Sequence, residues 1–132
     1  ELQSGDVCML AGTQSVFVAE GQTAELKQRL LEKDIDLTAS MWGAGELMSQ
    51  DSVKQMESQM LDIYPELCAG LAKFGLKQER RRMRLNIAQP KIDVQENNVL
   101  LTFVLPAGAY ATTVLREVIN YQDVSERHPI QE

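Results

Sequence analysis

Histidine and cysteine are scarce in this 132-residue sequence, and their scarcity excludes several kinds of site. The one histidine, His128, is close to the C-terminus. A Ser-His-Asp or Cys-His arrangement would need it to fold back from a tail, Glu126 to Pro129, that we expect to be loose. The two cysteines, Cys8 and Cys68, belong to no CxxC motif and have no nearby histidine. We therefore predict no metal site and no redox pair, and interpret both cysteines as buried thiols.

Long apolar runs and the common enzyme signatures are also absent. No segment approaches the roughly 18 apolar residues that span a bilayer, and the N-terminus has no basic start, so a cytoplasmic location is expected. The sequence contains no GxxxxGK[ST], GxSxG or HExxH motif and no GxGxxG after a strand. The 44% hydrophobic and 24% charged residues are typical of a soluble globular domain. Because the chain starts at Glu1, with a turn leading at once into a strand, we interpret it as a piece of a longer polypeptide.

Basic residues are outnumbered, with 13 Lys and Arg against 19 Asp and Glu, and the formal net charge is −6. This balance argues against a surface that is basic overall. The run KQERRRMR nevertheless concentrates cations between Lys77 and Arg84. Because phosphate attraction acts within about 8–10 Å, a local cluster can bind RNA on an acidic chain. The candidate RNA contacts are Lys77, Arg80, Arg81, Arg82 and Arg84. The alternative is a solvated helix end, where the helix dipole favours Lys and Arg.

The first half of the sequence predicts a hairpin, a helix, an extended segment and two more helices. The expected elements are strands at 7–10 and 16–18, a helix capped by Thr23 that runs to about Lys33, an extended segment at 36–39, a helix capped by Asp51, and a helix that starts at Pro65 and ends at Gly75. Gly43-Ala44-Gly45 is a weak phosphate-loop signal and is more typical of a flexible connector.

Helical spacing predicts which residues these two later helices bury. In the helix capped by Asp51, the expected apolar stripe is Val53, Met56, Met60 and Ile63. In the helix that starts at Pro65, the expected apolar side is Leu67, Cys68, Leu71 and Ala72.

From about Met83 the pattern changes to period two, which predicts strands with one buried face at 83–87 and around 92–94. Asn97-Asn98 is typical of a hairpin turn. The run Val99–Leu105 is apolar on both faces except for Thr102, which favours a central strand covered on both sides. After Pro106-Ala107-Gly108 we expect a helix from Tyr110 to about Asn120, with a buried face of Val114, Leu115, Val118 and Ile119.

The junction between that strand and that helix has the strongest chemical signal. The N-terminus of a helix presents free backbone N–H groups that can bind phosphate, and an aromatic ring beside them can stack on an unpaired base. Tyr110 would supply this ring. The alternative is an ordinary strand-turn-helix joint in which Tyr110 packs on its neighbours.

LPAGAYATTVLREVIN, from Leu105 to Asn120, resembles the C-terminal signature of the tRNA pseudouridine synthase D (TruD) family, Leu-Pro-x-Gly-x-[Phe/Tyr]-Ala-Thr followed by Arg-Glu. Three more segments are similar to family segments in the same order: Gly5-Asp6 with Leu10, Trp42-Gly43 to Glu46-Leu47, and Glu79-Arg80-Arg81 with Leu85. The resemblance therefore covers nearly the whole chain, but only the C-terminal part of a family member.

The resemblance implies an α/β (α+β) fold. Residues 1–80 would form the C-terminal part of the family's α/β insertion domain, and residues 81–132 the last antiparallel strands and helix of the pseudouridine synthase catalytic fold. The implied reaction is isomerisation of uridine to pseudouridine in tRNA, at position 13 of the D arm in the bacterial members, without metal or organic cofactor.

The implied site is incomplete in this chain. Tyr110 matches the family's aromatic position, which resembles part of the pocket for the extruded base. Arg116 and Glu117 match the motif and are assigned no more than a structural pairing. The family's catalytic aspartate lies in a Gly-Gln-Lys-Asp stretch that this sequence lacks, so no catalytic residue is assigned. We expect tRNA and the N-terminal part of the same polypeptide as partners; a non-catalytic RNA-binding or protein-interaction module of the same fold is the alternative.

Overall fold

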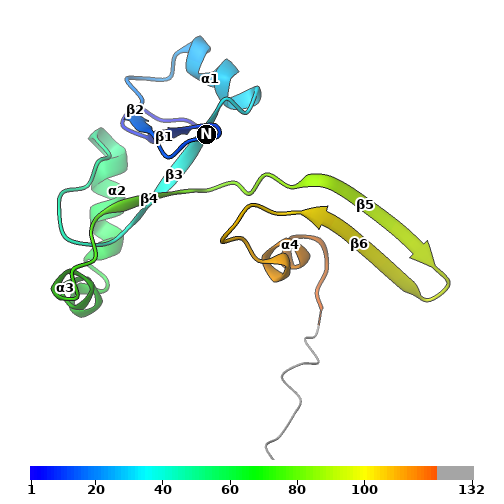
Figure 1. The fold of residues 1–132 in the computed structure, drawn as a ribbon. Coiled ribbons are helices and arrows are strands. Elements are labelled where there is room, and N and C mark those ends of the chain that lie inside the picture. The colour runs from blue at the N-terminus through cyan, green and yellow to red at the C-terminus, as the bar shows by residue number, and fades with distance from the viewer. Residues whose placement is uncertain (122–132) are drawn as a thin grey trace, which may run out of the picture. The chain divides into compact units, whose positions relative to one another are not determined.

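The computed structural model describes residues 1–121, in two compact units (Figure 1). The first unit is Glu1–Arg84 and the second begins at Leu85. The fold is mixed α/β with antiparallel sheets, in agreement with the predicted class. The predicted loose tail and His128 lie outside the described residues. None of the helices in residues 1–121 is long and apolar enough to cross a membrane.

The first unit is built on a four-stranded antiparallel sheet in the order β2-β1-β3-β4. Its strands are β1 (Val7–Leu10), β2 (Val16–Val18), β3 (Ile35–Met41) and β4 (Glu79–Arg82). The predicted hairpin of β1 and β2 is confirmed, with Cys8 opposite Phe17. β4 pairs with β3 at the edge of the sheet, with Arg82 opposite Thr38. The helix-end interpretation of the basic run is therefore wrong, because pairing with β3 holds these residues extended.

Helix α1 (Ala24–Leu31) covers one face of this sheet. The hydroxyl of Thr23 accepts the backbone N–H of Leu26 at 3.2 Å, which confirms the predicted cap. The core beneath the helix consists of Leu2, Cys8, Ala19 and Ile35, against which Leu10, Phe17, Leu26, Leu30 and Leu37 pack. Cys8 is fully buried, as predicted, whereas Cys68 is only half-buried.

Helix α3 (Pro65–Lys73) begins at the predicted residue, whereas helix α2 (Asp51–Leu61) begins one residue earlier than predicted. The cap position of α2 is occupied by Gln50 rather than by Asp51, whose carboxylate accepts a hydrogen bond from the Ser4 hydroxyl at 2.8 Å. Pro65 is the first residue of α3, and Gly75 follows its end with a left-handed φ of 80°.

The predicted buried sides of α2 and α3 are largely wrong. Val53 is buried, but the other three residues of the α2 stripe are exposed. In α3, Cys68 and Ala72 are half-buried and Leu67 and Leu71 are exposed. The reason is that the sheet face next to α2 is polar beside β4, where Arg80 lies. Helix α2 therefore turns Glu57 toward the sheet, and its methionines point away.

The second unit is a hairpin followed by one helix: β5 (Ala88–Gln95), β6 (Asn98–Val104) and α4 (Ala111–Val118). The turn is Glu96-Asn97, one residue earlier than predicted, because Asn98 already pairs with Gln95. Glu96 adopts a left-handed φ of 46°, as the first turn residue of a tight hairpin requires.

Two predictions for this unit are wrong. Residues 83–87 form no strand, and the apolar residues of the hairpin are not covered on both faces. Ile92, Val94 and Leu100 are exposed, because within the described residues no further element packs extensively against β5 or β6. In α4, Val114 is buried as predicted, but Val118 and Ile119 are exposed.

Candidate nucleic-acid interface

The basic run divides between the two faces of the first unit's sheet. Alternation along β4 places Arg80 and Arg82 on the face that carries Asp36 and Thr38, and Arg81 on the opposite face. Neighbouring arginines in the sequence therefore have different surroundings.

Arg80 is enclosed by polar partners of the first unit. Its Nη1 lies 3.0 Å from Glu57 Oε1, its Nε donates to Thr38 Oγ1 at 2.9 Å, and its Nη2 donates to the Thr38 carbonyl at 2.8 Å. The Ser49 hydroxyl donates to the same carboxylate at 2.6 Å. Only 3% of the Arg80 side chain is exposed. These contacts hold α2 on the sheet, and they occupy most of the hydrogen-bonding capacity of the Arg80 guanidinium.

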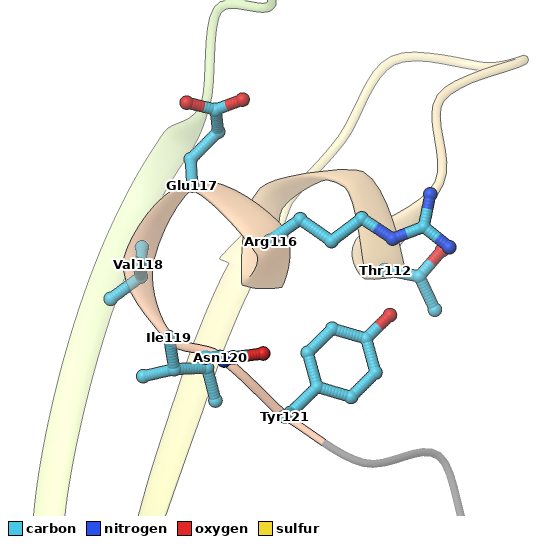
Figure 2. A pocket seen from close by; sticks show the side chains of 7 residues that line it. All are labelled: Thr112, Arg116, Glu117, Val118, Ile119, Asn120 and Tyr121. Atoms are coloured by element: carbon cyan, nitrogen blue, oxygen red, sulfur yellow. The ribbon is translucent and has the colours of Figure 1, made fainter.

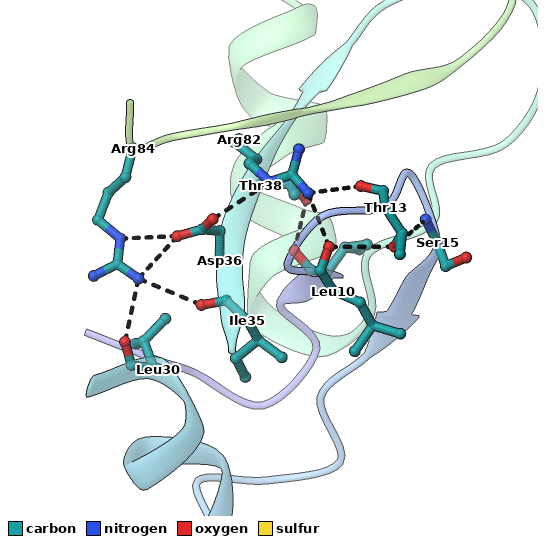
Figure 3. A network of polar contacts seen from close by, with 10 residues as sticks. Leu10, Thr13, Ser15, Leu30, Ile35, Asp36, Thr38, Arg82 and Arg84 are labelled. Carbon is teal, nitrogen blue, oxygen red and sulfur yellow. Dashed lines mark hydrogen bonds and ion pairs between the residues drawn. The ribbon is translucent and has the colours of Figure 1, made fainter. Parts of the chain in front are cut away.

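Arg82 and Arg84 share the carboxylate of Asp36, which is 1% exposed (Figure 3). Arg82 Nε lies 3.3 Å from Oδ2, and Arg84 Nη2 lies 2.9 Å from Oδ1. Arg82 Nη2 also donates to the carbonyls of Leu10 at 2.8 Å and Thr13 at 2.6 Å. A buried carboxylate is stable only when its charge is compensated, so this pair of guanidinium groups is a structural requirement of β3.

Arg81 and Lys77 differ from these three arginines. Both side chains are exposed, and neither forms an ion pair with any other residue of 1–121. Their cations are available to phosphates. From the sequence, all five basic residues were equal candidates for RNA contact. Contact with RNA stays a prediction for each of them, and the geometry favours Arg81 and Lys77.

Asp36 and Glu57, which neutralise the arginines, were not singled out from the sequence. One signal was present for Asp36, a charged residue between the apolar Ile35 and Leu37 in a predicted extended segment. For Glu57 there was none, because a glutamate on an amphipathic helix is ordinarily solvated.

The Gly43-Ala44-Gly45 segment is held against residues 76–78 by backbone pairing, unlike the free connector that we expected. Ala44 forms a parallel bridge with Lys77, and its backbone bonds to Leu76 and Gln78. A Cβ atom at Gly43 would collide with the Lys77 backbone. The glycine therefore permits two backbone segments to approach closely.

Tyr110 lies at the predicted strand-to-helix junction of the second unit. The turn after β6 passes through Gly108 with a left-handed φ of 82°, and Ala109 N–H donates to the Pro106 carbonyl at 3.2 Å. Tyr110 is the extended residue at the N-cap of α4, and its side chain makes no capping bond. It is 70% exposed, so within the described residues its ring is not part of a core.

A surface hollow of about 730 Å³ lies at the other end of α4 (Figure 2). Its lining includes Thr112, Arg116, Asn120 and Tyr121, but not Tyr110. Arg116 and Glu117 point in different directions, and no ion pair joins them in this part of the chain. The structural pairing suggested for these two residues is therefore wrong. No sequence signal indicated this hollow.

The titratable groups of the described residues form no metal site, and one buried thiol has a raised pKa. No group of three or more His, Cys, Asp and Glu side chains in residues 1–121 is placed to hold a metal ion. Burial is the main reason that the pKa of the Cys8 thiol is raised; Asp6 raises it further, and Arg29 opposes the shift.

Comparison with known proteins identifies the same family from three directions. Residues 1–118 match the family model for tRNA pseudouridine synthase D (TruD). Proteins named tRNA pseudouridine synthase D from Colwellia psychrerythraea and Shewanella oneidensis are 48% and 42% identical over 93% of this chain. A crystal structure described as a tRNA pseudouridine synthase D from Methanosarcina mazei superimposes with a TM-score of 0.64 and 25% identity over 89% of the chain.

The matched region is only part of each of these proteins. The chain covers 36% of the Colwellia protein, 33% of the Shewanella protein and 31% of the Methanosarcina chain. It spans about a third of the length of the curated relatives it matches.

Proposed function

The chain belongs to the tRNA pseudouridine synthase D family, and we propose that it supplies about a third of an enzyme that isomerises uridine to pseudouridine in tRNA. The observation that carries the proposal is the family's Leu105–Thr112 motif at the β6–α4 junction, with Tyr110 exposed at its centre. The proposed location is the cytoplasm, where tRNA is modified.

The two parts of the chain take different roles in this proposal. Residues 1–80 belong to the insertion domain and residues 81–132 to the catalytic domain. The structure divides after Arg84, close to this boundary, which supports the assignment and keeps the whole of β4 with the first part. The catalytic aspartate comes from polypeptide outside the matched third, and this chain contributes binding groups without the nucleophile.

Tyr110 is proposed to contact the uracil base. A uridine within a stacked helix cannot present the atoms that are attacked, so the enzyme must extrude it into a pocket. An exposed aromatic ring beside the N-terminus of a helix can stack on such a base, while the free N–H groups of the first turn face a phosphate. Tyr110 has both the exposure and the position that this role requires.

The cations of the first unit are proposed to contact the tRNA backbone, chiefly through Arg81 and Lys77. Arg82 and Arg84 retain 26% and 45% side-chain exposure, so they can add longer-range attraction. Arg80 contributes least, because its charge is compensated by Glu57 at 3.0 Å.

The test is a chimera in which this chain replaces the matched third of the Colwellia psychrerythraea protein. We expect the chimera to form pseudouridine at position 13 of tRNA, detected by carbodiimide modification and primer extension. The 132-residue chain alone is the control, and we expect it to give none. A folded chimera that binds tRNA without forming pseudouridine would support the non-catalytic RNA-binding module instead.

A further inference from the structure

Helices α2 and α3 leave their apolar side chains uncovered. In α2, Met56 and Met60 are 54% and 58% exposed, and Ile63, two residues after the helix, is 59% exposed. Beyond them, Leu67 is 64% exposed and Phe74, at the end of α3, is 87% exposed. Large apolar side chains at helical spacing ordinarily face a core.

The sheet cannot be what these residues face. Val53 and Glu57 already occupy the side of α2 that meets the sheet, the first by burial and the second through its ion pair with Arg80. Met56 and Met60 each follow one of these residues by three positions, which displaces them about 60° around the helix. α2 is therefore fixed on the sheet with its methionines directed elsewhere, and rotating it would break the buried pair.

We propose that the two exposed apolar stripes, one on α2 and one on α3, here together called the α2–α3 face, dock against the polypeptide that lies outside the matched third in the longer relatives. The α2–α3 face is defined by Met56, Met60, Ile63, Leu67, Leu71 and Phe74. The inference rests on the family membership and extends the proposed function by naming the interface that joins this chain to the rest of the enzyme.

The length of the relatives identifies the occupant. About two-thirds of the Colwellia protein lies outside the matched region, which is 36% of it. A segment of the same polypeptide meets the face at an effective concentration of about millimolar, which a second copy of the chain in solution does not approach. Covering the face also removes an exposed apolar surface of the kind that soluble monomers rarely keep.

The chemistry of the face indicates the kind of contact. It offers two methionines, three aliphatic side chains and one phenylalanine. Methionine adapts to irregular apolar partners, so an apolar helix or strand of the same polypeptide fits this face. The contact is dry and should depend little on salt, unlike a contact with tRNA phosphates.

The native methionines supply the probe for the test. Hydrogen peroxide converts an accessible methionine to its sulfoxide, and peptide mass spectrometry follows each residue separately. The reaction is run on the 132-residue chain and on the Colwellia chimera, with N-acetylmethionine amide added as the fully accessible reference. Met9, which is 2% exposed, is the protected reference and reports that the first unit is folded.

We expect Met56 and Met60 to oxidise near the reference rate in the short chain and at least tenfold more slowly in the chimera. Equal oxidation in both would overturn the proposal. Protection of the short chain that grows with its own concentration would assign the face to a second copy, and protection that appears only when tRNA is added would assign it to RNA; either result also overturns it. The matching chimera with the Shewanella protein is the second host if the first does not fold.

A pair of variants gives an independent reading. Met60→Glu should leave the melting temperature of the short chain unchanged and lower that of the chimera by several degrees, while Gln59→Glu, one position away and exposed, should change neither. Equal effects of Met60→Glu in both chains would contradict docking. Because no readout requires pseudouridine, an inactive chimera with protected methionines would leave the interface standing and refute only the proposed reaction.

Discussion

Arg80 and Glu57 form an ion pair of 3.0 Å between β4 and α2, with the arginine side chain almost completely buried. Removing one partner leaves a buried charge without compensation, which typically costs about 3–5 kcal/mol. Arg80→Ala should therefore lower the free energy of unfolding by about this amount in urea titrations. Arg81→Ala, at the exposed neighbouring position, should change it by less than about 0.5 kcal/mol. Equal effects of the two substitutions would contradict the structural role of Arg80.

Asp36 and Asp34 provide a matched pair of carboxylates two positions apart. Asp36 is 1% exposed and compensates Arg82 and Arg84, whereas Asp34 is 53% exposed and pairs with Arg29 at 2.6 Å. Asp36→Asn should lower the free energy of unfolding by about 3 kcal/mol or more, and Asp34→Asn by about 1 kcal/mol or less. Thermal and urea unfolding of both variants measure this difference. If Asp36→Asn left the free energy of unfolding unchanged, the two arginines would need no buried anion.

Arg81 and Lys77 are expected to contact tRNA phosphates in the longer enzyme. Neutralising one of them as Gln in the chimera should reduce the slope of log affinity against log salt by about 0.7–0.9 for each lost contact. Filter binding at several salt concentrations gives the slope. Lys27→Gln in α1, at an exposed position outside the basic run, is the control and should leave it unchanged. An unaltered slope for both Arg81→Gln and Lys77→Gln would remove these residues from the RNA interface.

Tyr110 should act through its aromatic face. Tyr110→Phe retains that face, so the chimera should keep nearly full activity. Tyr110→Ala removes a stacking interaction worth about 1–3 kcal/mol and should lower kcat/KM by about one to two decades. Because the ring is 70% exposed, neither change should alter the stability of the 132-residue chain. If Tyr110→Ala destabilised the chimera while the folded fraction kept its normal rate, the tyrosine would be a packing residue.

Because of Cys8, the free energy of unfolding should fall as pH rises in the alkaline range. Burial raises its pKa in the folded chain, so above the ordinary thiol pKa of about 8.5 the unfolded chain ionises first. The contribution of the neutral thiol is complete below this pH and is lost as pH rises toward the folded-state pKa. The free energy of unfolding of the wild type relative to Cys8→Ala should therefore decline between pH 8 and 10. Other groups titrate in both proteins and cancel, so a constant difference would contradict the raised pKa.

Local sequence signals determined the element boundaries that depend on a few neighbouring residues. Thr23 predicted the start of α1 because its hydroxyl can satisfy an N–H group of the first turn, and Pro65 predicted α3 because its fixed φ suits a first helical position. The Leu105–Thr112 motif located the β6–α4 junction and, through its family resemblance, the family itself.

Long-range pairing decided what local patterns left open. The basic run was compatible with a helix end, and only pairing with β3 made it a strand and sent Arg80 and Arg81 to opposite faces. Helical spacing gave α2 an apolar stripe but not its orientation, which depends on Glu57 meeting Arg80 across the sheet. Sequence thus fixed short-range conformation, because caps and turns are satisfied within a few residues. The tertiary structure decided which charges are buried and which apolar faces stay open, because those depend on partners such as Glu57 for Arg80 and Asp36 for Arg84, which are 23 and 48 positions away.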